Sequence, residues 1–244
     1  MEKNNLSKLN NYLQKDFETK DDIWLTSTYT LRKVVGLLGM ALPLLLFVFL
    51  WIIGEVTQPL ESISHYYYTR VSGIFVAIMS ILAIFLIIYK GSARVDLIVS
   101  LIAGIAALFV VFFPTDNLGI AGQVPAKAYA VTHLPINEFR ENLHLAAAAI
   151  FLGCLGYMSF FLFTKSNKVS KEAKGKKKIA RNRIYRTCGV IMAAAMGVIF
   201  FGGFCNWIPE DVYRDHELTF WMEAVAVESF GFSWFVKGET LFKD

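Results

Sequence analysis

The stretch SGIFVAIMSILAIFLIIYKGSARVDLIVSLIAGIAALFVVFFP, residues 72–114, decides the fold class. It contains two apolar runs of about 20 residues each, separated only by the turn KGSAR. A helix of that length crosses the hydrocarbon core of a bilayer, because each residue adds about 1.5 Å to its length. The sequence therefore predicts a hairpin of two transmembrane helices.

Four more runs of similar length and composition flank this hairpin. The six predicted spans are residues 34–54, 71–89, 95–114, 143–164, 185–204 and 218–236. Hydrophobic residues make up 55% of the 244 residues, and the spans leave no room for a soluble domain of ordinary size. We predict an all-α fold, an integral membrane bundle of six helices over residues 33–238.

Short polar segments surround the predicted bundle. Residues 1–32 form an N-terminal arm in which LSKLNNYLQ has the pattern of an amphipathic surface helix, although a solvated tail explains it equally well. Residues 165–184 form a basic loop, and residues 239–244 form a short tail. We interpret all three segments as cytoplasmic.

The distribution of Lys and Arg predicts this orientation. The loop 165–184 carries seven lysines and two arginines against the single acid Glu172. Because cytoplasmic loops carry an excess of Lys and Arg, this loop is expected in the cytoplasm. With six spans both termini then also face the cytoplasm. We predict an integral protein of the bacterial inner (cytoplasmic) membrane.

The basic loop predicts contact with membrane lipids. Each Lys or Arg near the surface is attracted to anionic headgroups by about 1 kcal/mol. The predicted headgroup contacts are Lys174, Lys176, Lys177, Lys178, Arg181 and Arg183. Because the loop lacks the interleaved aromatic residues of a nucleic-acid surface, we predict no nucleic-acid partner. The sequence leaves a homo-oligomer open.

Polar side chains gather at the predicted non-cytoplasmic ends of the spans. Glu228 is expected deeper, near the bilayer midplane, where an ionisable residue costs about 2.5 to 3.5 kcal/mol and normally faces the bundle interior. A functional residue and a buried structural carboxyl are equally good interpretations of Glu228. Glu223 lies about 140° around the same helix, so we do not expect the two carboxylates to share a site. The pocket candidates are Glu61, Ser64, His65, Asp116, His144, Glu223 and Glu228.

Other features of this layer admit two interpretations. We predict that the three consecutive tyrosines of PLESISHYYYTR, residues 59–70, anchor the second helix in the membrane interface. A zinc ion, which needs three or four ligands at about 2.0 to 2.2 Å, is an alternative occupant of the layer. Its candidate ligands are His65, Asp116, His144 and His216. No two of the histidines are spaced i, i+4, and the chain has neither a phosphate-binding loop nor a nucleophile elbow, so no catalytic residue is assigned.

Three segments carry a family resemblance: SISHYYYT, HLAAAAIFLGCLGYMSFFLF and FWMEAVAVESFGFSWFVKGE. In this order they resemble an uncharacterised family of six-span bacterial membrane proteins. More distantly, they resemble the six-span group that contains the damage-regulated autophagy modulators and the GPI-lipid-remodelling proteins. The resemblance implies a lipid-associated bundle with a polar pocket that opens outward. It carries over to Ser62, Ile63, Ser64 and His65 in the first loop, to His144, and to Glu228 with the FGF that follows it. At His65 the chain departs from that group, which has an acid there.

Three function classes remain open. The first is a lipid-associated or regulatory membrane protein whose outward pocket binds a headgroup. The second is a metal-dependent lipid-modifying hydrolase of the alkaline-ceramidase type, although the last span lacks that type's HxxxH pair. The third is a channel or transporter subunit, which needs a continuous polar path through the membrane.

Overall fold

The computed structural model describes residues 28–54, 56–91, 93–117, 130–165 and 175–238. Most of the predicted N-terminal arm, Lys174 and the tail 239–244 lie outside the described residues. Within the described part, regular structure is helical apart from one isolated bridge between Thr69 and Ala130. The all-helical prediction is confirmed.

Six long helices account for the apolar runs. They are α2 (Thr28–Gly54), α3 (Ser72–Ile88), α4 (Arg94–Phe112), α5 (Glu138–Tyr157), α6 (Lys176–Gly197) and α8 (Leu218–Lys237). Two π-helical segments, η2 (Met158–Leu162) and η3 (Val198–Phe204), continue α5 and α6. The short helices η1 (Ile63–Tyr68) and α7 (Glu210–Asp215) lie in the connections before α3 and α8.

Among the described helices, four are long and apolar enough to cross a membrane. They are Thr30–Ile53, Arg94–Phe112, Glu138–Leu162 and Lys176–Phe204. The apolar helix α3 is shorter, with 17 residues, and α8 carries two glutamates and a lysine. The four helices make the chain an integral membrane protein.

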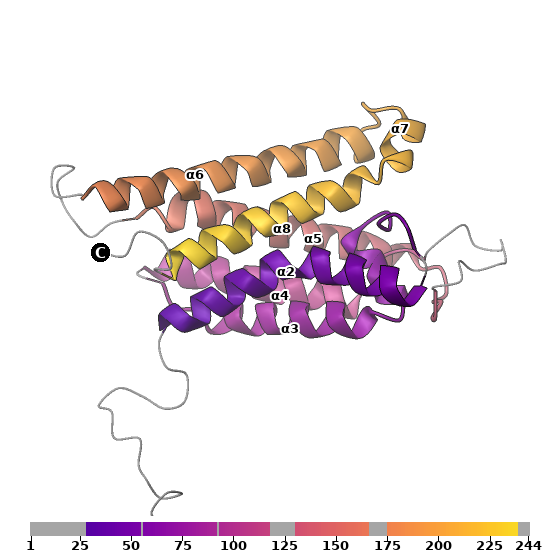
Figure 1. The fold of residues 1–244 in the computed structure, drawn as a ribbon, viewed down its shortest axis with the longest axis horizontal. Coiled ribbons are helices and arrows are strands. Elements are labelled where there is room, and N and C mark those ends of the chain that lie inside the picture. Colours follow the sequence, from indigo (N-terminus) through magenta and orange to yellow (C-terminus); the bar gives the residue numbers. More distant parts are fainter. Residues whose placement is uncertain (1–27, 55, 92, 118–129, 166–174, 239–244) are drawn as a thin grey trace, which may run out of the picture.

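The six long helices close into a ring. Each packs on the next along the chain, from α2 to α3, α4, α5 and α6, and α8 packs on both α6 and α2. Figure 1 shows them along the long axis of the molecule, with α7 at one end. We call this end the α7 end, and the end that holds the start of α6 the basic end.

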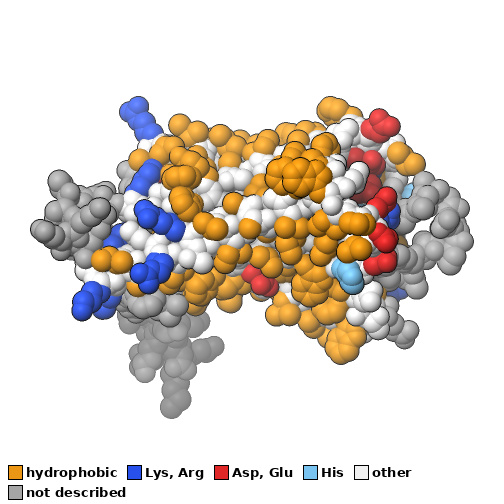
Figure 2. Space-filling model, turned by 90° about the horizontal axis from the view of Figure 1, so that it is seen from above, with side chains coloured by type: hydrophobic (Ala, Val, Ile, Leu, Met, Phe, Trp, Pro, Cys, Tyr) orange, Lys and Arg blue, Asp and Glu red, His pale blue; other side chains and the backbone are white. Residues whose placement is uncertain are grey.

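The surface of the ring is divided into bands. Large apolar side chains such as Leu44, Ile52 and Phe112 are at least 60% exposed around its outside. Figure 2 shows this apolar belt between an end rich in Lys and Arg and an end rich in Asp and Glu. An exposed belt of this size is unfavourable in water and favourable against lipid tails.

Three helices begin at least five residues earlier than predicted. α2 starts at Thr28 instead of residue 34, so residues 28–32 of the predicted arm are helical. α5 starts five residues before the predicted span, because the Asn137 side chain caps it by accepting a hydrogen bond from the Arg140 N–H at 3.0 Å. α6 starts at Lys176, so residues 176–184 of the predicted loop are helical. Hydropathy detects only the apolar part of a helix, whereas Lys, Arg and Ala extend it into the polar region.

The new start of α6 also changes the predicted headgroup contacts. Lys176, Lys177 and Arg183 are exposed and Lys178 is half-buried, but Arg181 is buried, with 6% of its surface exposed. The prediction of headgroup contact is therefore wrong for Arg181, because the helix turns this side chain into the bundle.

Glycine contacts close the ring at α2 and α8. A Cβ atom on Gly231 would lie 2.6 Å from the Gly36 carbonyl oxygen and 2.8 Å from the Met40 nitrogen. Both atoms belong to the backbone, so neither can move without shifting α2. This spacing is the small-residue packing that lets two membrane helices approach closely.

We expect Gly231→Ala to destabilise the protein, because the added methyl group forces α2 and α8 apart. The expected cost is about 1 to 3 kcal/mol, measured as a lower thermal unfolding temperature in detergent. Gly153→Ala in α5 is the matched control, since its Cβ would meet only the Met196 Cε atom at 3.8 Å. Equal effects of the two substitutions would contradict close packing at the α2–α8 contact.

Candidate functional site

A cavity of about 540 Å³ opens at the α7 end of the ring. Its lining comes from the connection before α3, the connection between α4 and α5, and from α5, η3, α7 and α8. The lining includes six of the predicted pocket residues: Glu61, Ser64, His65, Asp116, His144 and Glu223.

The connection before α3 is held in the cavity by backbone hydrogen bonds to α8. The first N–H groups of a helix have no acceptor within it. In α8, the Phe220 N–H donates to the Glu61 carbonyl at 3.0 Å. In return, the Ile63 N–H donates to Glu223 Oε2 at 2.7 Å. These two bonds fix the start of η1 beside the start of α8.

Buried tyrosines fasten the other end of this connection. Tyr66 and Tyr68 are fully buried, and the Tyr68 hydroxyl donates to the Thr115 carbonyl at 2.5 Å. Burial raises the pKa of Tyr68 to about 12, so the phenol keeps its proton. The prediction that these tyrosines anchor the helix in the membrane interface is therefore wrong for Tyr66 and Tyr68, because both point into the bundle.

His65 connects η1 to the end of α4. Its Nδ1 lies 2.9 Å from the Ser62 hydroxyl, and its Nε2 lies 3.4 Å from Asp116 Oδ1. The Thr115 hydroxyl donates to the same carboxylate oxygen at 2.8 Å. The contact with His65 and, to a smaller extent, the Thr115 hydrogen bond lower the pKa of Asp116 from 3.8 to about 2. Asp116 is thus an anion in the site at all physiological pH values.

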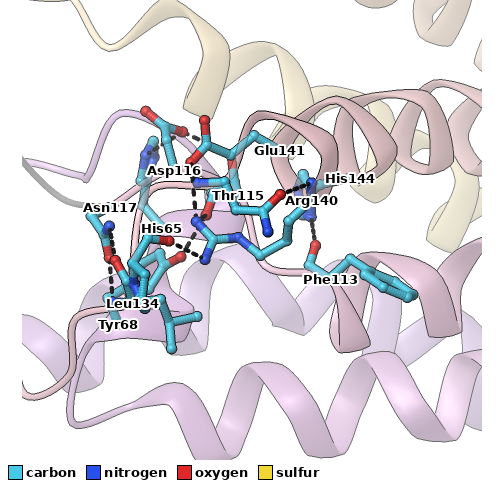
Figure 3. A network of polar contacts seen from close by, with 12 residues as sticks. His65, Tyr68, Phe113, Thr115, Asp116, Asn117, Leu134, Arg140, Glu141 and His144 are labelled. Atoms are coloured by element: carbon cyan, nitrogen blue, oxygen red, sulfur yellow. Dashed lines mark hydrogen bonds and ion pairs between the residues drawn. The ribbon is translucent and has the colours of Figure 1, made fainter.

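A polar network holds the ends of the α4–α5 connection (Figure 3). Arg140 donates to the carbonyls of Pro135 and Thr115 at 2.9 and 3.4 Å and pairs with Glu141 at 3.0 Å. Asn117 makes two hydrogen bonds with the Leu134 backbone, at 2.7 and 2.9 Å. The network fixes the residues beside Asp116, while residues 118–129 lie outside the described part.

His144 sits one and a half turns into α5 and is buried. Its Nδ1 lies 2.8 Å from the Phe113 carbonyl, which can only accept a hydrogen bond. Nδ1 therefore carries the hydrogen, and in the neutral ring Nε2 keeps its lone pair. His144 thus adds an acceptor to the polar groups of the cavity.

The two glutamates of α8 line different cavities. Glu223 is half-buried in the cavity, whereas Glu228 is exposed and lines a second cavity with Met40 of α2 and Arg183 of α6. Five residues along a helix turn the direction by about 140°. With Glu223 in the site, the same helix cannot bring Glu228 there.

The predicted zinc ligands are only partly assembled. His65, Asp116 and His144 share the cavity, but His216 ends α7 on the surface and does not line it. Among the described residues, no three His, Cys, Asp or Glu side chains lie close enough together to hold a metal ion. The geometry therefore gives no support to a zinc centre.

A smaller, mainly apolar cavity adjoins the first one toward the middle of the ring. It has a volume of about 40 Å³ and is lined mainly by apolar side chains of α2, α3, α4 and α5. Ser64, Ala148 and Glu223 line both cavities. The site is therefore polar at the α7 end and apolar toward the middle of the bundle.

Two parts of the lining were missed in the sequence. The residues alone give Ser62 no role, and they predict a loop for the whole of α7. Tyr213 of α7 and Ile208, just before α7, pack onto two glycines of η3. The two non-glycine residues with positive φ in the described chain, Asn206 and Glu217, lie on either side of α7. A helix-start signal was present: Pro209 followed by Glu210 and Asp211 in the first turn.

The chain matches no protein-family model, no curated protein and no solved structure. The resemblance to the six-span lipid-remodelling group therefore stays a prediction.

We expect Asp116 to make the protein sensitive to acid. Because its folded-state pKa lies below the ordinary value, its contribution to stability is complete above about pH 4 and is lost as the pH falls through about 2. The unfolding temperature of the wild type should exceed that of Asp116→Asn near neutral pH, and this gap should close near pH 2. The gap is expected to be small, since the Asp116 side chain is 62% exposed. The control is Asp211→Asn on the surface of α7, and a gap for Asp116→Asn that persists at pH 2 would contradict the assignment.

Proposed function

We propose that this chain is a six-span protein of the bacterial inner membrane that binds a membrane lipid through the cavity at its α7 end. In this arrangement both termini lie in the cytoplasm and the cavity faces outward. The observation that carries the proposal is the cavity itself, which is polar at its mouth and apolar within. A lipid has a matching arrangement, because its polar headgroup fits the polar part and its apolar tails fit the apolar part.

The proposed orientation is supported by charge. The alternation of the six helices puts the starts of α2 and α6 and the end of α8 at the basic end. The exposed Lys176, Lys177 and Arg183 belong to this end, as expected of a cytoplasmic face. Both α3 and α8 then cross the membrane as well, and the 20 residues of α8 are enough for about 30 Å.

Access from the side supports a ligand that comes from the bilayer. Leu145 of α5 lines the cavity and is 56% exposed. Gly202 and Gly203 of η3 also line the cavity, and the side chains of Ile208 and Tyr213 pack against them. The lining of the cavity therefore meets the lipid-facing side of the ring at Leu145 of α5.

The polar lining favours a headgroup that donates hydrogen bonds and carries positive charge. Glu61, Asp116, Glu210, Glu217 and Glu223 contribute carboxylates to the lining. Among the described lining residues Arg214 is the single Lys or Arg, and it lies within 3.6 Å of both Glu61 and Glu210. An ammonium group satisfies such a set of acceptors better than an added anion does.

Topology is tested by thiol labelling in a Cys205→Ser background, because Cys205 is exposed. A membrane-impermeant maleimide should label Asp211→Cys on α7 in intact spheroplasts. It should label Lys177→Cys only after permeabilisation. Labelling of both positions from the same side would refute the six-span arrangement.

Lipid binding is tested with the purified protein in detergent. Phosphatidylethanolamine, which carries an ammonium group, should raise the unfolding temperature more than phosphatidylglycerol with the same acyl chains. At about 100 times the dissociation constant the expected stabilisation is about 2.7 kcal/mol, which corresponds to a shift of a few degrees.

Two matched variants test whether the lipid binds in the cavity. Glu223→Gln should reduce the stabilisation by phosphatidylethanolamine, because it removes a carboxylate from the lining. Glu228→Gln makes the same change on the other face of α8 and should leave the stabilisation intact. Equal shifts with the two lipids, or the same response from the two variants, would overturn the proposal.

A further inference from the structure

Three polar side chains form a chain of contacts along one wall of the cavity. The Ser62 hydroxyl lies 2.9 Å from His65 Nδ1, and His65 Nε2 lies 3.4 Å from Asp116 Oδ1. All three residues line the cavity. A hydroxyl within hydrogen-bond reach of an imidazole, with a carboxylate near the other ring nitrogen, is the arrangement that activates a serine for nucleophilic attack. In this structure the contact between His65 and Asp116 is an ion pair, and Nε2 makes no hydrogen bond to the described residues.

The structural role of Ser62 leaves its proton available. As the N-cap of η1, Ser62 Oγ accepts a hydrogen bond from the His65 N–H at 3.3 Å. A hydroxyl accepts through its lone pairs and donates through its hydrogen, so the same group can still donate to Nδ1. The cap thus holds Oγ beside the imidazole, and the Thr115 hydrogen bond holds the Asp116 carboxylate beside the other ring nitrogen.

We propose that Ser62 and His65 transfer an acyl group from an ester-bearing lipid held in this cavity, with Asp116 as a positioning residue. This inference rests on the lipid-binding role proposed above. The position of the serine fits the substrate class, because the esters of a glycerolipid lie between its headgroup and its tails. Ser62 is two residues from Ser64, which lines both the polar cavity and the smaller apolar cavity.

The proposed reaction has two balanced halves. Ser62 Oγ forms a bond to the ester carbonyl carbon while its proton passes to His65 Nδ1. The C–O bond of the ester then breaks, the proton moves from Nδ1 to the departing alcohol oxygen, and the acyl group remains on Ser62. Water or a second alcohol attacks this acyl-serine and gives its proton to His65, which returns it to Ser62 Oγ as the acid or the new ester leaves.

An alkyl fluorophosphonate tests the proposal on the full-length protein in detergent. Attack by an activated serine joins Oγ to phosphorus and expels fluoride, which leaves a stable adduct of known mass. We expect about one adduct per chain, located on Ser62 by fragmentation of the labelled peptide. His65→Gln should slow labelling by about 100-fold or more, since the general base is lost.

The variants separate catalysis from helix capping. Ser62→Asn keeps a capping side chain but has no hydroxyl, so it should retain the unfolding temperature and lose the label. Asp116→Asn should slow labelling and change its pH profile, which a purely structural role would not do. Ser72→Ala, at the start of α3, should label like the wild type.

Two results would overturn the proposal: an unlabelled wild type, or a label that persists in Ser62→Asn. Stabilisation by phosphatidylethanolamine without labelling would retain the binding function and remove the acyl transfer. Labelling on Ser62 without lipid-dependent stabilisation would retain the reactive serine and remove the proposed ligand.

Discussion

The connection between α2 and α3 runs through the interior of the protein. Its backbone N–H and C=O groups therefore need hydrogen-bond partners there. Most of its described residues are buried, and an unpaired polar group in the interior costs several kcal/mol. The hydrogen-bond partners come from segments that are distant in the sequence. α8 contributes Glu223 and Phe220, and the α4–α5 connection contributes Thr115. The hydrogen bonds that this one segment requires therefore bring α8 and the α4–α5 connection to it, and these three parts of the chain form the cavity.

Much of the fold was readable from hydropathy. The six apolar runs coincide with the six long helices, and a turn of five residues after α3 sets α4 beside it. Helix ends were less predictable, because Asn137 and the lysines that begin α6 are polar and lie outside any apolar window. The order of packing around the ring depends on close contacts such as that of Gly36 with Gly231, which no hydropathy scan detects.

The depth of polar residues was more predictable than their direction. Glu61, Ser64, His65, Asp116, His144 and Glu223 were placed in one layer from their distance to the span ends, and the structure brings them to one cavity. Glu228 was assigned by depth alone, and its face of the helix takes it elsewhere. The resemblance names Ser62, but the residues alone do not predict its contact with His65, because this contact depends on a 3₁₀ turn whose short period the apolar pattern does not reveal.

The two ends of the ring are closed by different chemistry, and this difference bears on the class of function. At the basic end, Lys165 pairs with Asp96 at 2.6 Å, and Lys237 lies over the rings of Phe163 and Tyr185. Both rings are fully buried, so they fill the interior at that end. A channel needs a polar path through both ends of the bundle. In the described residues the polar cavity lies at the α7 end, and a smaller apolar cavity adjoins it. A site that is open at one end and packed at the other favours binding and local chemistry over conduction.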